Sequence, residues 1–222
     1  MTLRSKFFAA TYDRQMAKVE KGGLRAHRES VLAGATGRVL EIGAGTGGNL
    51  PFYGPGVESL TMTEPEVPML RRLERKVRER APEATVLRAP AEDLPFEDDS
   101  FDAAVSTLVL CGVDDQPRAL RELRRVLRPG ARLLFIEHVR SADPKLARKQ
   151  DRMNGISRFM VGCECNRPTL KTIEAGGFDV TKIEHVTAKK VPKFVSPFIV
   201  GSARTATVMS SRQSPLTGRE QV

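Results

Sequence analysis

A carboxylate and a run of glycines follow a short apolar segment near the start of the chain. Glu41 stands two residues before Gly43, and further glycines follow at Gly45, Gly47 and Gly48. Glycines at such a turn let the backbone bend sharply and let a ligand lie directly against backbone amides. The carboxylate can accept a hydrogen bond from a cationic or amino group. These residues predict a ligand-binding loop, although the glycine pattern alone also satisfies the dinucleotide fingerprint.

A second acid, Glu64, ends an alternating apolar run over residues 59–63. It lies about 20 residues beyond the glycine loop, where a Rossmann-type sheet places the carboxylate that accepts hydrogen bonds from a ribose diol. A nicotinamide-dependent oxidoreductase remains an alternative that the glycine pattern allows. The acid ahead of the glycines and the segment 127–130 argue against it.

Strands and helices must alternate to bring these acids together. From residue 38 onward, apolar runs alternate with amphipathic segments, which predicts a doubly wound, mainly parallel α/β sheet with its ligands at the carboxyl ends of the strands. We expect a helix after Gly47, interrupted at Pro51, and further helices over 66–80, 116–127, 142–160 and 169–175. The expected strands make a seven-stranded Rossmann-like sheet and cover 38–42, 58–63, 84–88, 101–106, 131–137, 178–186 and 198–207.

The chain divides into three parts. Residues 1–36 have helical spacing of apolar residues, with a break at Gly22–Gly23, and predict an N-terminal helical lid over the ligand site. Residues 37–209 form the main domain. The segment 210–222 has no periodicity and predicts a disordered tail.

Composition narrows the range of partners. The 222 residues suit one domain with its own core, and three cysteines make no disulfide framework, which favours a reducing, cytoplasmic setting. The net charge of +9 raises the possibility of an RNA-associated or non-catalytic protein. Arginines interleaved with acids and only 5% aromatic residues favour a solvated surface and no nucleic-acid partner. No apolar run has the length of a membrane span, so we expect no integral membrane association. We expect either a monomer or a homodimer.

The order of further motifs carries a resemblance to a known family. Ala91–Phe96, Ser100–Asp102 and Leu127–Gly130 follow the two acids in turn. With them, the chain resembles the class I S-adenosylmethionine (SAM) methyltransferases of the methyltransferase type 11 group. A narrower resemblance rests on residues 106–111, on 137–139 and on Gly162–Cys163 with Arg167, and points to the alkyl-thiol S-methyltransferases.

This resemblance implies the fold expected above, SAM as cofactor and S-adenosylhomocysteine as product. It implies that the glycine loop meets the amino-acid tail, that Glu64 accepts from the ribose and that the segment after the third strand meets the adenine. The expected cofactor-binding residues are Glu41, Gly43, Gly45, Gly47, Glu64, Pro65, Ala91, Glu92, Thr107 and Leu108.

The implied reaction transfers a methyl group to a small acceptor, and we expect a thiol. An N- or C-methyltransferase acting on a phospholipid amine, a quinone or a natural product is the alternative. His138, just after the fifth strand, is the candidate general base. The expected acceptor-binding residues are Tyr12, Cys111, Cys163 and Arg167. No metal is expected, because Cys163-Glu164-Cys165 has no histidine close in sequence and no second cysteine pair.

Overall fold

The computed structural model describes residues 12–14, 16–189 and 191–206. The expected tail at 210–222 and residues 1–11 of the expected lid lie outside this part of the chain. Among the described residues, no helix combines the length and the apolar character needed to cross a membrane.

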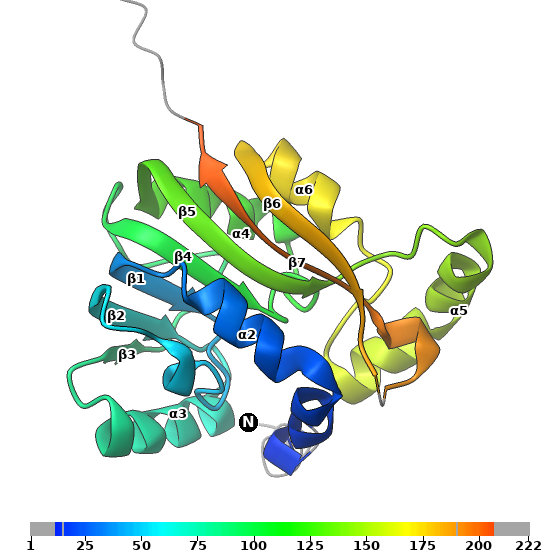
Figure 1. The fold of residues 1–222 in the computed structure, drawn as a ribbon, viewed down its shortest axis with the longest axis horizontal. Coiled ribbons are helices and arrows are strands. Elements are labelled where there is room, and N and C mark those ends of the chain that lie inside the picture. The colour runs from blue at the N-terminus through cyan, green and yellow to red at the C-terminus, as the bar shows by residue number, and fades with distance from the viewer. Residues whose placement is uncertain (1–11, 15, 190, 207–222) are drawn as a thin grey trace, which may run out of the picture.

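Seven strands form one sheet in the order β3-β2-β1-β4-β5-β7-β6 (Figure 1). Strands β1 to β5 run parallel to one another, whereas β7 pairs antiparallel with both β5 and β6. This confirms the mainly parallel seven-stranded Rossmann-like sheet. The strands are β1 (Gly37–Ile42), β2 (Val57–Thr63), β3 (Thr85–Leu87), β4 (Phe101–Thr107), β5 (Leu127–His138), β6 (Phe178–Thr187) and β7 (Pro197–Thr205).

Helices cover both faces of the sheet. Helix α2 and helix α3 bury Leu32 and Leu73 in one apolar cluster with β1, and α4 and α6 bury Leu120 and Ile173 in a second cluster on the opposite face. Helix α5 extends away from the sheet at one end (Figure 1). The bounds are η1 (Glu20–Leu24), α2 (Arg25–Leu32), η2 (Leu50–Phe52), α3 (Val67–Arg80), α4 (Gln116–Val126), α5 (Pro144–Val161), α6 (Thr169–Ala175) and η3 (Lys193–Val195).

The helix expected after Gly47 is wrong. Only the short 3₁₀ helix η2 forms there, with the Phe52 amide donating to the Asn49 carbonyl over 2.9 Å. Pro51 inside this turn has no N–H to donate, and Gly54 and Pro55 follow directly, so an α-helix cannot propagate. The chain therefore passes from the glycine loop to β2 through compact turns.

The sheet reverses its winding between β1 and β4. Strand β1 pairs with β2 on one side and with β4 on the other, and Ile42 stands opposite Ser106 in the β1–β4 ladder. Ligands of open α/β sheets bind in the crevice outside the carboxyl ends of the strands at such a point. The glycine loop after β1, Glu64 after β2 and Thr107 at the end of β4 all lie at this edge.

Candidate active site

The glycine loop takes a backbone path that side chains rarely allow. Gly43, Gly45 and Gly47 have φ values of +54°, +60° and +76°. A Cβ atom at Gly43 would meet the Val109 side chain at 2.6 Å, so this glycine is required by packing. Among the described residues, a Cβ atom at Gly45 would approach only Tyr12, at 3.8 Å. Of these three positive-φ glycines, Gly45 is the one that leaves space for a ligand against its backbone.

Glu64 is buried at the carboxyl end of β2, with 5% of its surface exposed. Its Oε2 atom accepts a hydrogen bond from the Gly45 amide over 2.8 Å, and its Oε1 atom accepts from the Glu66 amide over 2.9 Å. Burial raises the pKa of this carboxyl, and the two backbone amides oppose the shift. A carboxylate has about four acceptor sites, so two remain for a ligand's hydroxyls.

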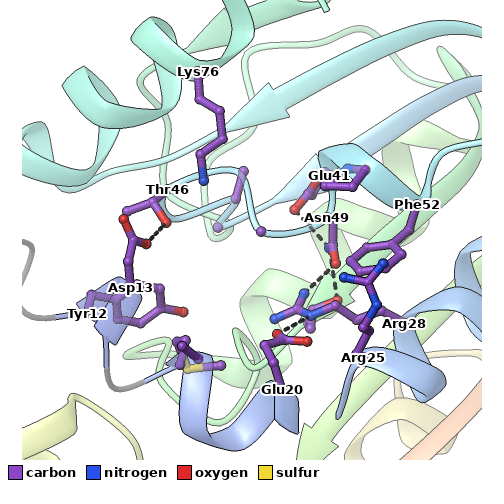
Figure 2. Close-up of a pocket in the computed structure, with 17 residues that line it drawn as sticks. Tyr12, Asp13, Glu20, Arg25, Arg28, Glu41, Thr46, Asn49, Phe52 and Lys76 are labelled. Atoms are coloured by element: carbon purple, nitrogen blue, oxygen red, sulfur yellow. Dashed lines mark hydrogen bonds and ion pairs between the residues drawn. The ribbon is translucent and has the colours of Figure 1, made fainter. Parts of the chain in front are cut away.

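A cavity of about 380 Å³ lies between the glycine loop (Gly43–Gly48) and the described residues that precede β1, called the N-terminal segment below. Figure 2 shows Tyr12 and Asp13 on one side of it and Glu41 and Asn49 on the other. Its size falls in the range of small-molecule sites. Four of the expected site residues line it, namely Tyr12, Glu41, Gly43 and Thr107.

Glu41 belongs to a buried hydrogen-bond network. Its two carboxylate oxygens accept from Asn49 Nδ2 over 2.9 Å and from the Tyr53 hydroxyl over 2.7 Å. Burial raises the pKa of Glu41 to about 7, although the Tyr53 bond and the nearby Arg28 charge oppose the shift. A cationic ligand group would restore the ionised form, because an opposite charge favours it.

Arg28 on α2 is a site residue that the sequence analysis missed. Its guanidinium is buried, donates to Glu20 Oε1 over 2.8 Å through Nε, and donates to Asn49 Oδ1 through a second nitrogen (Figure 2). Asn49 also donates to Thr107 Oγ1 over 3.1 Å. These contacts join the N-terminal segment to the glycine loop. Nothing in the local sequence marks Arg28, since one more arginine on a charged helix is unremarkable there.

The N-terminal segment forms a wall of the cavity. Asp13 accepts a hydrogen bond from Thr46 Oγ1 of the glycine loop and pairs with Arg72 of α3 over 3.5 Å. Burial raises the pKa of Tyr12 to about 12, so its hydroxyl keeps its proton at neutral pH. The position of the N-terminal segment beside the cavity suits the expected lid. Movement of that lid stays a prediction.

Three of the expected cofactor-binding residues, Glu92, Ala91 and Pro65, already make contacts within the protein. Glu92 Oε1 accepts from the backbone amides of Asp114 and Asp115, over 2.8 and 3.3 Å, and so holds the turn before α4. Ala91 packs in the cluster beneath α4, and the Pro65 carbonyl accepts from Arg88 over 3.1 Å. Adenine contacts by these residues stay predictions.

Glu137 of β5 shapes the loop after β4. One carboxylate oxygen accepts from Ser106 Oγ over 2.6 Å and from the Val109 and Leu110 amides over 3.0 and 3.1 Å. The other accepts from the Cys111 amide over 3.2 Å. Leu108, at φ +60°, begins this turn. The buried carboxylate thereby fixes the backbone that carries Leu108 and Cys111 at the carboxyl edge of the sheet.

The fold brings His138 to two of the cysteines. Its Nδ1 atom lies 3.4 Å from Cys111 Sγ and 3.1 Å from Cys163 Sγ. Burial lowers the pKa of His138 to about 4, so the ring is neutral near pH 7. No histidine lies close to Cys163 in sequence, but β5 and the turn after α5 meet in space and bring His138 to it. A general-base role for His138 stays a prediction.

Arg167 lies beside this group and is held by the protein. Its Nε atom pairs with Glu164 Oε2 over 2.9 Å, and its guanidinium donates to the Leu110 carbonyl over 3.2 Å. Both contacts tie the turn after α5 to the loop after β4. An acceptor contact by Arg167 stays a prediction.

A family profile described as a methyltransferase domain matches residues 40–135. Thiol S-methyltransferase TMT1A of Homo sapiens is 32% identical over 203 residues, which cover 88% of this chain and 82% of that relative. The chain belongs to the class I SAM-dependent methyltransferases. Thiol S-methyltransferase TMT1B of Homo sapiens is 36% identical over 78% of this chain and 73% of its own.

Other methyltransferases share the sequence or the fold. A phosphatidylethanolamine N-methyltransferase of Cereibacter sphaeroides is 30% identical over 74% of this chain and 85% of its own length. Among solved structures, a possible histamine N-methyltransferase of Thermotoga maritima has a TM-score of 0.67 at 23% identity and covers 90% of this chain and 97% of its own. A geranyl diphosphate methyltransferase in complex with SAM has a TM-score of 0.63 at 16% identity, covering 82% of this chain and 85% of its own.

SAM is thus the cofactor of this methyltransferase, and the residues present fit it. The open approach at Gly45 suits a backbone contact, the Glu64 carboxylate has free acceptor sites, and the cavity holds the Glu41 carboxylate for a cationic amino group.

Glu41→Gln tests the buried carboxylate through the pH dependence of stability. The native state binds more protons between the ordinary pKa of 4.5 and the raised pKa of about 7, so Glu41 destabilises the fold progressively as pH rises through that window. The unfolding free energy of the wild type minus that of the variant should fall by on the order of 3 kcal/mol between pH 4.5 and 7 in urea titrations.

The variant is the necessary reference in this experiment. The lowered pKa of His138 acts in the opposite direction, because its stabilising contribution is present above about pH 6.5 and is lost as pH falls towards 4. His138 is common to both proteins and cancels in the difference. A difference that stays flat from pH 4.5 to 7 would contradict the raised pKa of Glu41.

Proposed function

We propose that this SAM-dependent methyltransferase methylates the sulfur of a small thiol. The observation that carries the proposal is the similarity to two human thiol S-methyltransferases over most of their length and most of this chain. The similarity extends beyond the methyltransferase domain match at residues 40–135 into the C-terminal third. That third supplies the turn with Cys163 and Arg167 beside the loop after β4.

Methylation of a thiol does not need a strong general base. SAM, when bound, supplies a methyl carbon activated by a positively charged sulfur. A thiol of pKa about 8.5 is partly ionised near neutral pH, so an acceptor thiolate is available without a strong proton acceptor. What the protein must do is align the reactants and exclude water. Glu64, the Gly45 backbone and Glu41 hold the cofactor, and the N-terminal segment closes one side of the cavity.

A lipid amine is the second candidate acceptor. The phosphatidylethanolamine N-methyltransferase relative supports it. Helix α5 adds a structural reason, because Ile156 and Phe159 are 51% and 66% exposed on a helix that also carries several lysines and arginines. Exposed apolar side chains among basic ones suit contact with an anionic lipid surface.

A product assay separates the two acceptors. The protein is incubated with SAM carrying a labelled methyl group and with thiols, amines, phenols and phosphatidylethanolamine vesicles, and products are identified by mass. We expect label on thiol sulfur. For a series of alkyl thiols of graded acidity, kcat/KM should rise with pH up to the pKa of each thiol and then level, because the thiolate is the nucleophile.

Label on the lipid amine with none on the thiols would overturn the proposal in favour of the second candidate. A pH dependence of kcat/KM that is the same for thiols of different pKa would also contradict thiolate attack. Gly45→Val, which we expect to have no measurable SAM binding, serves as the control, so that non-enzymatic methylation of reactive thiols is subtracted.

A further inference from the structure

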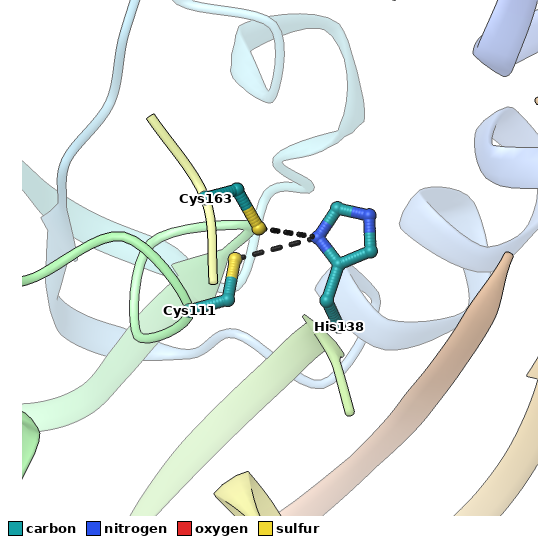
Figure 3. Close-up of side chains that lie close together, drawn as sticks. All are labelled: Cys111, His138 and Cys163. Atoms are coloured by element: carbon teal, nitrogen blue, oxygen red, sulfur yellow. Dashed lines mark hydrogen bonds between the residues drawn. The ribbon is translucent and has the colours of Figure 1, made fainter. Parts of the chain in front are cut away.

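Three side chains with soft or borderline metal-ligand atoms converge at the carboxyl edge of the sheet. Cys111 comes from the loop after β4, His138 from the end of β5 and Cys163 from the turn after α5 (Figure 3). The two Sγ atoms and the histidine Nδ1 atom all lie within 4.8 Å of one another. Both sulfurs point at the same ring nitrogen.

The spacing suits a tetrahedral zinc ion. Zinc binds thiolate sulfur at about 2.3 Å and imidazole nitrogen at about 2.0–2.1 Å, so a sulfur and a nitrogen on one ion lie about 3.6 Å apart. The distances from His138 Nδ1 are 3.4 Å to Cys111 Sγ and 3.1 Å to Cys163 Sγ. Shifts of a few tenths of an ångström would bring both pairs to the zinc geometry.

The protein holds each of the three residues in place. The Cys111 amide is bound to Glu137, and the Cys111 carbonyl accepts from the Glu164 amide over 2.8 Å, which ties the two cysteine segments together. The His138 ring packs on Phe198 with centroids 4.3 Å apart and hydrogen-bonds the Val195 backbone. Metal-binding histidines are typically oriented by such a second contact.

The third cysteine of the chain lies just outside this group. Cys165 Sγ is 3.7 Å from Cys163 Sγ, but it also contacts Ser157 Oγ at 3.3 Å and is not among the three mutually close ligand atoms. Three protein ligands with an open fourth position are the arrangement of catalytic zinc sites, whereas structural sites have four.

We propose that Cys111, His138 and Cys163 bind one Zn²⁺ ion whose fourth position takes the acceptor thiol. The site rests on the proposed thiol methylation for its role, and its placement agrees with that role. Cys111 is four residues beyond Thr107, which lines the cofactor cavity, in the loop at the end of β4. His138 is then a metal ligand and not the general base expected from its position.

The chemical step balances with zinc present. On binding, the acceptor thiol releases its proton to solvent and its sulfur becomes a zinc-bound thiolate. The sulfur forms a bond to the methyl carbon of SAM, the bond from that carbon to the sulfonium breaks, and its electron pair remains on the departing sulfur. The products are S-adenosylhomocysteine and a neutral thioether, which is a weaker zinc ligand and leaves.

Cobalt substitution tests the site without any turnover. The full-length reduced protein, free of metal, is titrated with Co²⁺ under anaerobic conditions, and cysteine coordination is read from sulfur-to-cobalt charge-transfer absorption. We expect one Co²⁺ per chain, displaced by Zn²⁺. Cys111→Ser, Cys163→Ser and His138→Gln should each weaken binding by at least tenfold, and His185→Gln, on the exposed β6 strand, should bind as the wild type does.

Cys165→Ser and an added thiol test the open position. The Cys165→Ser variant should retain Co²⁺ with unchanged charge-transfer intensity, and an alkyl thiol added to the wild-type complex should increase that intensity by one further sulfur ligand. Circular dichroism on each variant shows that it is folded. Loss of Co²⁺ binding in Cys165→Ser, or no response to thiol, would overturn the open fourth position.

Failure of the zinc site and failure of thiol methylation are distinguishable. Absence of stoichiometric Co²⁺ binding, or full thiol methylation by protein stripped of metal, would overturn the zinc proposal and leave the proposed function standing. Metal binding that responds to thiol, with no thiol methylated in the product assay, would leave the site standing and overturn the proposed function.

Discussion

Glu64→Ala is expected to weaken SAM binding by about 100-fold, since a charged acceptor of two ribose hydroxyls contributes on the order of 3 kcal/mol. The carboxylate is buried and already oriented by the Gly45 and Glu66 amides, so it accepts a ligand's hydroxyls without reorganising. Removing it also leaves the Gly45 amide without its acceptor inside the loop. Isothermal titration calorimetry with SAM gives the affinity directly.

The neighbouring acid provides the control. Glu66 is exposed and contributes its backbone amide to Glu64, so Glu66→Ala keeps this hydrogen bond and should bind SAM within a factor of about three of the wild type. Thermal unfolding of both variants separates lost binding from lost folding. A folded Glu64→Ala protein with the affinity of the wild type would refute the ribose assignment.

Gly45→Val should abolish measurable SAM binding. The residue has φ +60°, and Tyr12, 3.8 Å from where a Cβ atom would stand, is its nearest described neighbour on that side. A valine would fill the approach to the loop backbone and would also favour a different φ, at a cost of about 1–2 kcal/mol. Loss of the calorimetric signal, with unchanged far-ultraviolet circular dichroism, is the expected observation.

A substitution at a glycine far from the site serves as the control. It distinguishes the effect of backbone strain from the effect of a side chain that fills the ligand site. Gly177, between α6 and β6, has φ +82°, and the nearest non-adjacent atom that the structure describes, Arg124 Nε, would lie 4.0 Å from a Cβ atom at this residue. Gly177→Val should lose similar stability and keep its affinity for SAM. If Gly45→Val binds SAM as tightly as Gly177→Val does, the ligand does not lie against the Gly45 backbone.

The features that depend only on neighbouring residues in the chain were predicted best. Apolar periodicity and glycine or proline breaks indicated every strand of the sheet to within a few residues, except that β5 begins at Leu127 and not at residue 131. The prediction of a helix after Gly47 was wrong, because Pro51 prevents the α-helix that usually follows the first strand of such a sheet. Short-range sterics and hydrogen bonding decide such features, and they are visible in a window of a few residues.

Only some of the site residues could be predicted from the sequence. Glu41 lies near the end of β1, Gly43 and Gly45 follow that strand and Glu64 follows β2, and the structure places them at one sheet edge. Arg28 gave no signal, because its importance comes from burial against Asn49, 21 residues away, and not from its neighbours in the chain.

The α/β fold, the glycine loop and the two acids that point to SAM can be inferred from the amino-acid sequence, since each depends on residue types at short, regular spacing. Two features follow only from the packing of the chain: Arg28 bridges the N-terminal segment to the loop, and Cys111, His138 and Cys163 meet. Those cysteines lie 27 and 25 residues from the histidine. Contacts over such separations depend on how strands and helices pack, because only the packed sheet brings the ends of β4, β5 and α5 to one edge.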